Sequence, residues 1–411
     1  MDNFLNVFLN NNHIGTLKKN NNGGIIFQYS EGANRILSLS LPIQNEPFDN
    51  KQCRGFFNGL LPESEHVRIA IGKKYGINHK NDFSILRAIG YDCAGAVSFF
   101  DNSNENYSSY LKEYYELNYT PISDNELEKC IKELPQKPLA TGIKDMRLSL
   151  AGIQDKCAVI VADGKIGFPE NNTPTTHILK SQIYGFNETI ENEFICIKAA
   201  DKLGIKVPDI KIGCANSTKY FLIQRYDRKI IDGKVKRIHQ EDFCQASNII
   251  SAYKYQAEGG ADFKRCFKIL RKTTQPAISI NKFIDLMIFN YLIGNNDAHG
   301  KNFSILHYDN GKTEFAPAYD ILCSSVYPEL SRKMAMKIGG HYEHDKIFLR
   351  HFEKSANDAD ISFTQLKKII KNQCELLPDI LDEVIKSFEN KIGKDILSAV
   401  EKNCRRLLKE F

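Results

Sequence analysis

Short alternating stretches of apolar and polar residues fill the beginning of the chain. Between residues 4 and 41 the apolar positions, such as Phe4 and Leu9, recur with polar residues between them. A period of two is typical of strands that bury one face. The pattern predicts a small antiparallel sheet, with further strands over 24–29 and 36–41.

Two helical patterns and a polar stretch come next. Pro62 followed by Glu65 is typical of a helix start, and apolar positions behind it give the helix a buried face. A second short helix is predicted over 82–90, and a strand after Gly95. Residues 101–127 are polar and poor in aliphatic side chains, which predicts a linker or an exposed crossing between an N-terminal subdomain and the rest.

The middle of the chain predicts strands around one long helix. Residues 146–164 indicate a strand, a turn of small residues and a second strand, and 176–180 indicate another strand. A helix is predicted from about 187 to 203, with Asn187 as its cap and acidic residues near its positive end. Residues 219–228 predict a strand that leads into a connector.

From Glu241 onwards, helical spacing dominates. Residues 278–294 place apolar side chains, among them Phe283 and Met287, at helical spacing, which predicts a buried helix. Residues 362–411 predict amphipathic helices without site chemistry. No repeat with a period of 20–50 residues is present.

Composition narrows the class of protein. The chain has 411 residues, 42% of them apolar, which is enough for a core and two to three domains. Its formal charge of +5 permits a basic patch but does not indicate a nucleic-acid binder. The eleven cysteines include no CxxC pair, which favours reduced thiols over a disulfide framework or a zinc site. No apolar run reaches 18 residues, and the start reads as a strand, so neither a membrane partner nor a targeting segment is expected.

The sequence YLIGNNDAHGKN, residues 291–302, concentrates chemistry at the end of the predicted buried helix. Asp297 and Asn302 are five positions apart, which is the spacing of a kinase catalytic loop. In such a loop the Asp accepts the proton of the substrate hydroxyl, and the Asn binds magnesium. Asp320, in FAPAYDIL, is the candidate for a second metal ligand. His299 is expected to brace the loop or contact phosphate. An ordinary solvated turn is the alternative.

The order of elements then indicates a two-lobed, protein-kinase-like fold of the α+β class. A mixed β/α N-lobe would precede a helical C-lobe, with an extra β-rich subdomain in front. We predict three segments: an N-terminal subdomain over 1–105, the N-lobe with its linker over 106–235, and the C-lobe over 236–411.

A lysine and a turn of small residues are candidates for phosphate binding. Lys180 ends a predicted strand, where kinases place the lysine that binds the α- and β-phosphates. Glu193 could orient it, although Glu188 and Glu191 compete for this role. An exposed lysine at a strand end is the alternative. The turn over 149–156 lacks a Walker or GxGxxG motif, yet its small residues can offer N–H groups to phosphate; a plain hairpin turn is its alternative.

Two further groups of residues have side chains that could act as ligands. Gln224, Arg225 and Tyr226 end a strand where an interlobe connector would contact adenine, and a core tyrosine is the alternative for Tyr226. His341 and His344 are three positions apart without a third ligand at a fitting spacing. A solvated loop is therefore expected there, not a metal site.

Taken together, these segments resemble the HipA family of bacterial serine/threonine kinases, the toxin half of a toxin–antitoxin pair. The resemblance covers about residues 4–405 and implies the full-length form with its N-terminal subdomain. It is carried, in the family's order, by FFNGLLPES, IGYDCAGAV, SLAGIQDK, PTTHILK, NEFICIKAADKLGI, QRYDR, QEDFCQA, NDAHGKNFS and PAYDI.

The resemblance implies a role for each matching position. Asp297 resembles the catalytic base, and Asn302 and Asp320 resemble the Mg2+ ligands. Ser149 matches the autophosphorylated serine, whose phosphate is expected to expel the phosphate loop and inactivate the kinase. The family often has Glu where this chain has Gln224. The residues assigned to the ATP site are Ala151, Gly152, Ile153, Gln154, Asp155, Lys156, Lys180, Gln224, Arg225, Tyr226, His299, Lys301, Asn302, Tyr319 and Asp320.

The resemblance also implies partners. The family's substrates are aminoacyl-tRNA synthetases, typically the one for glutamate, whose phosphorylation arrests translation and growth. A HipB-like DNA-binding antitoxin is the expected partner, through which the pair represses its own operon at operator DNA. Residues 339–345 contain no Lys or Arg, so direct DNA contact by this chain stays open. The expected location is the bacterial cytoplasm, with secretion into a host cell left open.

Two other functions stay open at this stage. DxHxxN strings also occur in lipid kinases, so the chain could phosphorylate a lipid or another small molecule. It could also be a non-catalytic corepressor that acts with an antitoxin. The presence of Asp297, Asn302, Asp320 and Lys180 argues against the second alternative, because a protein without catalysis has no need of all four.

Overall fold

The computed structural model describes most of the chain as two compact units. The described residues are 3–101, 111–134, 156–170, 173–388 and 391–411. The first unit comprises Met1–Ser181, Gly213–Ala252 and Leu306–Lys312, and the second comprises Gln182–Ile212, Tyr253–Ile305 and Thr313–Phe411. The three segments expected from the sequence stay a prediction.

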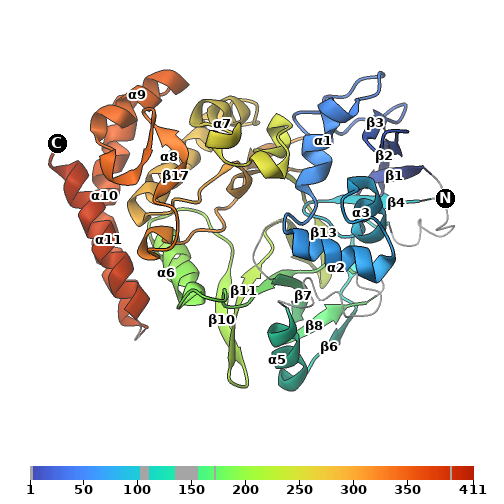
Figure 1. Ribbon diagram of the computed structural model, residues 1–411, viewed down its shortest axis with the longest axis horizontal. Coiled ribbons are helices and arrows are strands. Elements are labelled where there is room, and N and C mark those ends of the chain that lie inside the picture. Colours follow the sequence, from blue (N-terminus) through green and yellow to red (C-terminus); the bar gives the residue numbers. More distant parts are fainter. Residues whose placement is uncertain (1–2, 102–110, 135–155, 171–172, 389–390) are drawn as a thin grey trace. The chain divides into compact units, whose positions relative to one another are not determined.

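An antiparallel sheet begins the first unit, with strand order β3-β2-β1-β4 (Figure 1). Its strands are β1 (Phe4–Leu9), β2 (Asn12–Lys19), β3 (Ile25–Tyr29) and β4 (Val97–Phe100). The predicted strand over 36–41 is wrong. The Tyr29 hydroxyl accepts from the Leu37 N–H at 2.8 Å and donates to the Leu41 carbonyl at 2.6 Å. This side chain thereby binds backbone groups that a neighbouring strand would otherwise pair.

Three helices connect β3 to β4 and share one buried core with this sheet (Figure 1). They are α1 (Asn50–Gly59), α2 (Glu65–Tyr75) and α3 (Asp82–Ile89). Asp49 and Asn81 cap α1 and α3 by accepting from backbone N–H groups. Both helices predicted in this part of the chain are therefore present.

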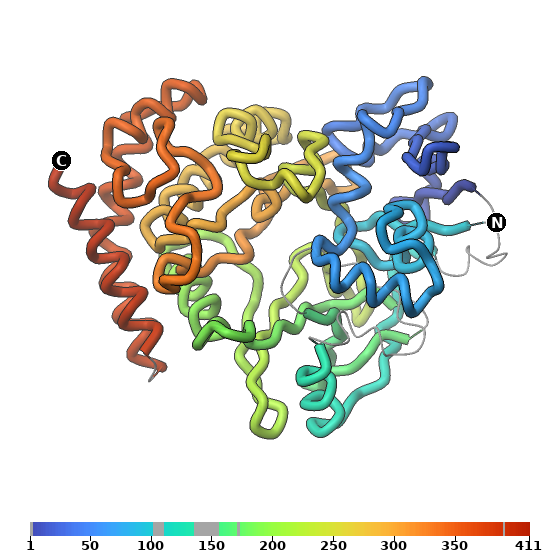
Figure 2. The backbone as a smooth tube through the Cα atoms, viewed as in Figure 1, coloured from blue at the N-terminus to red at the C-terminus, as the bar shows by residue number. Residues whose placement is uncertain are grey.

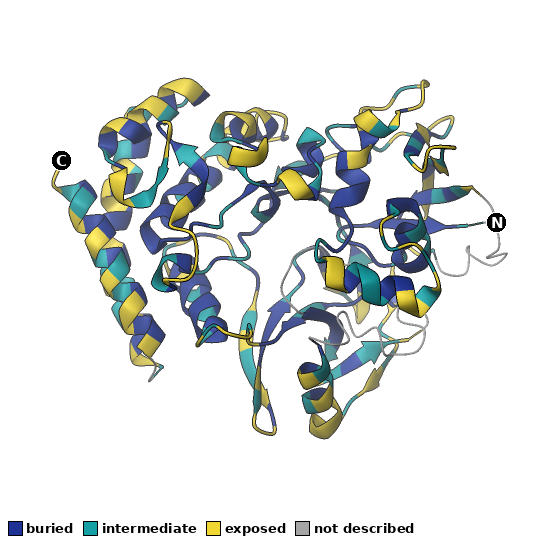
Figure 3. Cartoon of the chain, viewed as in Figure 1, coloured by how far each residue is buried: buried dark blue, intermediate teal, exposed yellow. Residues whose placement is uncertain are grey.

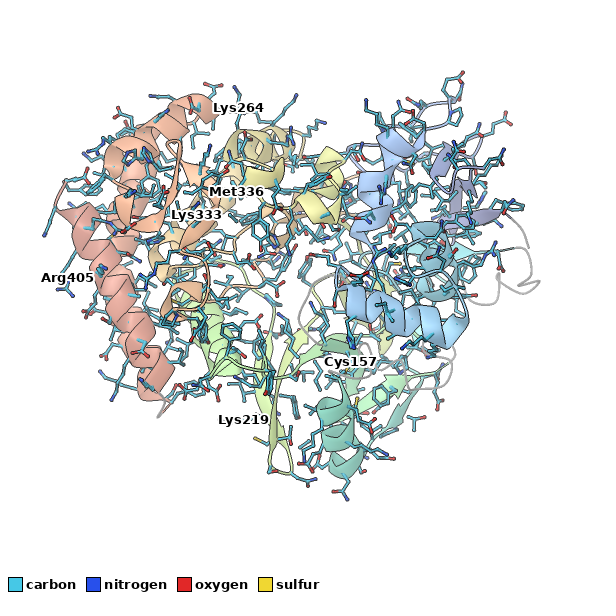
Figure 4. The ribbon with its side chains drawn as sticks, viewed as in Figure 1. Cys157, Lys219, Lys264, Lys333, Met336 and Arg405 are labelled. Atoms are coloured by element: carbon cyan, nitrogen blue, oxygen red, sulfur yellow. The ribbon has the colours of Figure 1, made fainter. Side chains whose placement is uncertain are left out.

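The second sheet of this unit has six strands, in the order β10-β11-β9-β7-β8-β6. They are β6 (Tyr119–Pro121), β7 (Lys156–Ala162), β8 (Lys165–Pro169), β9 (His177–Lys180), β10 (Ile210–Ala215) and β11 (Thr218–Gln224). Figure 2 shows the hairpin of β10 and β11, and Figure 4 labels Cys157 on β7 and Lys219 on β11. Cys157 and Leu179 belong to the same buried core as the first sheet, so the two sheets form one folding unit.

The described second half of the segment predicted over 101–127 is mostly exposed, as expected for a crossing, but it forms regular structure and is not a plain linker. It contains β5 (Tyr115–Glu116) and β6, and it leads into α5 (Asp124–Glu133), which Ser123 caps with a capping box. β6 pairs with β8 at the edge of the six-stranded sheet. Strands of two or three residues are too short to show the alternation of apolar and polar positions. The sequence pattern therefore did not predict them. The remaining strands of this unit are β12 (Arg228–Ile231), β13 (Lys234–Arg237) and β14 (His239–Asp242).

Helices dominate the second unit, as predicted. They are α6 (Thr189–Lys202), α7 (Phe263–Leu270), α8 (Pro276–Ile293), α9 (Leu349–Ala359), α10 (Phe363–Lys386) and α11 (Lys391–Leu408). α10 and α11 pack side by side, as Figure 2 shows. The short strands β15 (Ser304–His307), β16 (Thr313–Phe315), β17 (Lys333–Ile338) and β18 (His341–Glu343) lie between α8 and α9 in the sequence.

Three sequence-based expectations can be compared directly with this structure. All eleven cysteines lie among the described residues and are free thiols. Within the described ranges, no helix combines the length and the apolar character that a bilayer crossing requires. His341 is exposed as expected, but His344 stacks on the Tyr291 ring at 4.4 Å, so the expectation of a solvated loop fails for His344.

Candidate active site

Helix α8 ends where the candidate chemistry begins. Its second half is buried, and Gly294 closes it with a φ of 76°, a left-handed conformation that glycine adopts readily. Gly294 also allows a close approach, because a Cβ there would lie 2.2 Å from the Ser325 Oγ. The chain therefore leaves α8 sharply, and residues 295–302 form the loop that carries Asp297 and Asn302.

A tyrosine outside the loop holds the carboxylate of Asp297. The Tyr255 hydroxyl donates to Asp297 Oδ1 at 2.6 Å, and its ring meets the His299 ring edge-on at 5.3 Å between centroids. The Asp297 N–H donates to the Asn295 side-chain oxygen at 3.2 Å. Within the described ranges, Asp297 forms no ion pair with Lys or Arg. A neutral donor thus orients a partly exposed carboxylate.

Hydrogen bonds to backbone carbonyls hold Asn302 close to Asp297. The Asp297 carbonyl accepts from the His299 N–H at 2.8 Å and from the Asn302 Nδ2 at 3.1 Å. The Asn302 N–H donates to the His299 carbonyl at 2.9 Å. Since the amide nitrogen of Asn302 is used for this contact, its oxygen is the atom left to coordinate a cation. The five-residue spacing therefore corresponds to one closed turn.

Tyr319 connects this turn to the peptide that carries Asp320. Its hydroxyl donates to the Lys301 carbonyl at 2.7 Å and accepts from the Ser304 Oγ at 2.6 Å. Asp320 is partly exposed and has a φ of 51°, a left-handed conformation in which Asp is among the more tolerated side chains. Such a backbone at a candidate ligand is typical of a functional site.

Helix α6 holds the peptide that follows Asp320. The fully buried Asn192 side chain accepts from the Cys323 N–H at 2.8 Å and donates to the Cys323 carbonyl at 3.0 Å. It also contacts the Tyr327 hydroxyl at 3.2 Å. Sequence reasoning missed Asn192. The sequence offered no local signal that distinguishes Asn192 from the other polar residues of α6, such as Glu191 and Glu193.

The donor set fits a magnesium ion better than a zinc-type site. Among the residues that the structure describes, no three His, Cys, Asp or Glu side chains gather as metal ligands. Asn302 and Asp320 instead offer one amide oxygen and one carboxylate. Magnesium is commonly bound by one or two carboxylates together with waters and substrate phosphates, so two protein oxygens are sufficient.

In the first unit, two lysines occupy paired positions of the six-stranded sheet. Lys156 on β7 lies opposite Lys180 on β9 in the antiparallel register, and both are buried, with relative exposures of 8% and 4%. Side chains directly opposite each other have Cβ atoms about 5 Å apart, and like charges in this position destabilise a sheet. Two buried lysines thus occupy neighbouring positions on one face of the sheet.

The three residues assigned to adenine lie at the end of β11, and they differ in how far they are exposed. Gln224 and Tyr226 are partly exposed, whereas Arg225 is buried. The Arg225 guanidinium donates to both carboxylate oxygens of Asp227, at 3.0 and 2.9 Å, and to Thr175. The backbone N–H of Arg225 donates to the Thr176 carbonyl at 2.9 Å. The Arg225 side chain therefore has a structural role. Of the groups of Arg225, only the backbone carbonyl remains for the predicted contact with ATP.

Arg225 belongs to a larger group, which we call the buried ion cluster. Its members are Asp92, Arg225, Asp227, Arg228 and Arg237. Asp92 comes from the loop before β4, and the other members come from the segment that follows β11. The cluster therefore joins the N-terminal part of the first unit to the strand end at Gln224.

Some predicted site residues cannot be placed. Ser149, Ala151, Gly152, Ile153, Gln154 and Asp155 lie outside the described residues. Glu193 is buried on α6, but it belongs to the second unit and Lys180 to the first, so their predicted pairing stays a prediction. His299 and Lys301 are buried within the second unit.

Two family models match the chain. The HipA N-terminal domain matches residues 5–100, and the HipA-like C-terminal domain matches residues 148–387. A Sinorhizobium fredii protein named as a kinase, Y4mE, is 37% identical over 388 residues, which are 93% of this chain and 91% of that protein. The serine/threonine-protein kinase toxin HipA of Shewanella oneidensis is 28% identical over 362 residues, which are 85% of this chain and 81% of that protein.

A solved structure shows the same fold. A chain of the Shewanella oneidensis MR-1 complex of HipA, HipB and operator DNA superposes with a TM-score of 0.85 at 24% identity. The match covers 98% of this chain and 97% of that one. The α+β, protein-kinase-like fold predicted from the order of elements is thereby confirmed.

Proposed function

The chain belongs to the HipA family, and from this premise we propose that it transfers the γ-phosphoryl group of ATP to a serine or threonine of a protein. The relatives confirm the predicted enzyme class, a serine/threonine-protein kinase. As a family member of the toxin type, the chain would arrest the growth of the cell that makes it.

Asp297 is the proposed general base. Tyr255 occupies Oδ1 of its carboxylate, so Oδ2 is the oxygen that accepts the proton of the substrate hydroxyl. As this proton leaves, the hydroxyl oxygen bonds to the γ-phosphorus, and the bond from that phosphorus to the β–γ bridging oxygen breaks. The products are a phosphorylated side chain and ADP.

Asn302 and Asp320 are the proposed Mg2+ ligands. Bound magnesium offsets the negative charge of the triphosphate and of the group in transfer. Asn302 is held in place by the Asp297 carbonyl, and the peptide of Asp320 is fixed by Tyr319 before it and by Asn192 after it. These contacts fix the Asn302 side chain and the backbone around Asp320 before any ligand binds, which lowers the cost of ordering them.

Lys156 and Lys180 are the proposed phosphate-binding residues of the first unit. Their paired burial places two positive charges at neighbouring points of one sheet face. Gln224 and Tyr226 are proposed to contact adenine, Gln224 through its backbone and Tyr226 through its ring. Ser149 is proposed as the site of inhibitory autophosphorylation, with residues 151–155 as the phosphate loop.

The proposed cellular target is an aminoacyl-tRNA synthetase, in the first place the one for glutamate. Its phosphorylation would halt translation in the bacterial cytoplasm. A HipB-like antitoxin is the proposed partner, with operator DNA bound through it. In support, the solved HipA relative is bound to HipB and operator DNA.

One observation carries the kinase proposal: a closed turn in which Tyr255, Asp297 and Asn302 are joined by hydrogen bonds. The test is mass spectrometry of the purified chain and of a bacterial lysate after addition of ATP and Mg2+, compared with Asp297→Asn. We expect phosphate on Ser149 and on a synthetase with the wild type only. Phosphate on Ser149 in the isolated Asp297→Asn chain would show that the base has been assigned wrongly.

Two further readouts, ATP consumption and promoter repression, separate the two alternatives. A lysate in which ATP is consumed without any new phosphoprotein would indicate a lipid or other small-molecule substrate. A chain that consumes no ATP, yet represses its promoter together with an antitoxin, would indicate a corepressor without catalysis.

A further inference from the structure

Two cysteines from different elements of the first unit meet between helix α5 and the six-stranded sheet. Cys130 lies on α5 and Cys157 on β7, and the Cys157 S–H donates a hydrogen bond to the Cys130 sulfur. The two residues are 27 positions apart in the sequence, so no local spacing indicated that they meet. We call them the thiol pair.

The inner face of α5 carries Cys130 towards the sheet. Leu127 and Ile131 of α5 are buried, and so is Leu134, which directly follows the helix. Positions three and four apart lie on one face of a helix, so Cys130 belongs to this face. Figure 3 shows both buried and exposed positions on α5. Cys130 packs against a buried core, and Cys157 is a member of that core.

Contacts with the sheet hold α5 in place. The Ile122 N–H, just before α5, donates to the Ile166 carbonyl of β8 at 3.0 Å. Within α5, the Glu128 carboxylate accepts from the Asn216 side chain at 3.0 Å and from the Thr218 hydroxyl at 2.9 Å. These two partners lie at the turn between β10 and β11. The relative position of the two sulfur atoms is therefore fixed by regular structure.

The two thiols differ in accessibility and in acidity. Cys130 is partly exposed, whereas Cys157 is fully buried. The hydrogen bond from Cys157 lowers the pKa of the Cys130 thiol, although burial opposes this shift. The hydrogen bond to Cys130 and burial raise the pKa of Cys157. Because the thiolate is the nucleophile in disulfide exchange, Cys130 is the residue that reacts first with a reagent from solution.

Another pair of cysteines, in the second unit, lacks an accessible member. Cys374 on α10 and Cys404 on α11 are joined by a hydrogen bond, and each has a relative exposure of only 2%. The hydrogen bond with Cys404 and burial raise the pKa of Cys374 well above its ordinary value. Proximity is thus common to both pairs, and only the thiol pair combines it with access from solution. The buried pair is a control within the same chain.

We propose that the thiol pair is a site of reversible disulfide formation, with a low-molecular-weight disulfide, oxidised glutathione, as its co-reactant. The structure holds the reduced state, in which both residues are free thiols. Disulfides that form in a reducing compartment are usually transient or redox-sensing, and a partly exposed thiol beside a buried one suits such a role.

The exchange has two steps. The Cys130 thiol gives its proton to solvent, and its sulfur attacks one sulfur of oxidised glutathione. The S–S bond of the reagent breaks, and one glutathione thiolate leaves and takes up a proton. The Cys157 sulfur then loses its proton to solvent and attacks the Cys130 sulfur of the mixed disulfide, from which the second glutathione leaves. Two protein thiols are oxidised, and one disulfide is reduced to two thiols.

The first step prepares the second. Besides burial, both causes that raise the pKa of Cys157 come from Cys130, namely the hydrogen bond and the negative charge of its thiolate. Once the Cys130 sulfur is part of a mixed disulfide, it carries no charge, so the Cys157 thiol loses its proton more readily. The buried residue becomes a nucleophile only when its partner has reacted.

The disulfide would lie on the face of the sheet opposite to the proposed phosphate-binding lysines. In the register of β7 and β9, Lys156 pairs with Lys180, and Cys157 pairs with Leu179. Neighbouring residues of a strand point to opposite faces, so the sulfur of Cys157 is directed away from the side of Lys156. The site is therefore separate from the proposed kinase chemistry.

The test is mass spectrometry of the full chain after incubation with oxidised glutathione at neutral pH. Remaining thiols are alkylated, and trypsin then gives peptides 130–132 and 157–165, which contain the two members of the thiol pair. We expect these peptides to be joined by a disulfide that dithiothreitol removes. Peptides 372–386 and 403–405, which contain the buried control pair, should be joined at least about tenfold more slowly.

Three single variants separate the steps. In Cys157→Ser the second step has no nucleophile, so one glutathione should remain on Cys130. In Cys130→Ser the buried Cys157 should stay unmodified. Cys374→Ser is the matched control, because it removes a buried thiol from the other pair, and it should leave the yield of the 130–157 disulfide within about twofold of the wild type. Far-UV circular dichroism checks that each variant is folded.

Several results would overturn the proposal. One is a wild-type chain in which the exposed Cys214 carries glutathione but the two peptides of the thiol pair are not joined. Another is joining of the control pair at the same rate, which would mean that accessibility does not matter. Glutathione on Cys157 in Cys130→Ser would contradict the order of the steps. The measurement contains no ATP, so none of these results bears on the proposed kinase activity.

Discussion

Each unit contains a cluster of polar side chains, and the two clusters differ in how their charges are satisfied. In the buried ion cluster of the first unit, Asp92 and Asp227 pair with arginines at distances down to 2.6 Å, and all five members are buried. In the loop of the second unit, Asp297 is partly exposed, and a neutral tyrosine hydroxyl is its side-chain donor.

The pKa shifts follow the same division. Burial alone would raise the pKa of Asp227, but Arg225 and Arg228 outweigh it and hold the pKa well below its ordinary value. Burial and the neighbouring Arg225 lower the pKa of Arg228 to about 10. These charges hold one another in place through ion pairs.

The partners of a carboxylate indicate whether it stabilises the fold or takes part in a reaction. A carboxylate surrounded by guanidinium groups is compensated from within and stabilises the fold only as a complete set. A carboxylate oriented by neutral hydrogen bonds keeps its charge available for a proton or a metal-bound substrate. The same residue type therefore has opposite roles in the two units.

The largest expected effect is on activity. Asp297→Asn keeps the size of the side chain and an acceptor for Tyr255, but removes the proposed base. Phosphoryl transfer should fall by about a thousandfold, within the range measured for general bases. The free energy of unfolding should change by less than about 1 kcal/mol. Radiolabelled ATP and urea denaturation measure the two quantities, and a large loss of stability would mean that Asp297 is structural.

The same type of substitution in the buried ion cluster should destabilise the fold. Asp227→Asn leaves Arg225 and Arg228 buried without their shared anion. Breaking a buried ion pair in this way costs about 3 to 5 kcal/mol. Urea denaturation of the variant should show this loss. A cost below about 1 kcal/mol would mean that Asp92 alone compensates the arginines, and the comparison between the two clusters would fail.

Acid should weaken the fold through a partly buried histidine, His344. Burial lowers the pKa of His344 to about 4, although its hydrogen bond to the Tyr291 carbonyl opposes the shift. In the unfolded chain this histidine takes up a proton near pH 6.5, whereas in the fold it stays neutral. Stability is therefore fully present above pH 6.5 and is lost as the pH falls towards 4, by about 3 kcal/mol in total.

Urea denaturation at steps between pH 7 and 4.5 measures this loss, and His344→Gln is the control. His239, whose pKa is also lowered by burial, should leave part of the acid sensitivity in that variant. An unchanged pH profile in His344→Gln would show that His344 does not contribute.

The smallest expected effect concerns Tyr255. Tyr255→Phe removes the hydroxyl that holds Asp297 Oδ1 but keeps the ring against His299. We expect kcat to fall about tenfold while the KM for ATP stays unchanged, since the contact orients the base and not the nucleotide. A role in packing alone would leave kcat at the wild-type value. A rise in KM with normal kcat would place Tyr255 in ATP binding.

Sequence patterns were sufficient where the chemistry is local. The apolar spacing before Gly294 predicted α8, and the spacing of Asp297 and Asn302 predicted a turn that the hydrogen bonds show to be closed. Short or irregular elements were missed. The two- and three-residue strands β5 and β6 have no measurable period, and residues 36–41 have a strand-like pattern but are held by Tyr29 instead.

Contacts between distant positions were beyond the reach of any local pattern. Tyr255 lies 42 positions before Asp297, and Asn192 lies 131 positions before Cys323. Arg225 looked like a nucleotide contact because of its neighbours, and only its pairing with Asp227 and Thr175 showed that it is structural. The side of a strand on which a residue lies depends on register, and register is set by partners elsewhere in the chain.

The sequence by itself determined the types of the long elements and the composition of the loop after α8, since these follow from periodicity and spacing along the chain. The tertiary structure alone decided which oxygen of Asp297 is occupied, which amide holds the peptide after Asp320, and that Lys156 faces Lys180 across two strands. The physical reason is that a hydrogen bond or an ion pair depends on distance in space, and distance along the chain constrains it only within a few residues.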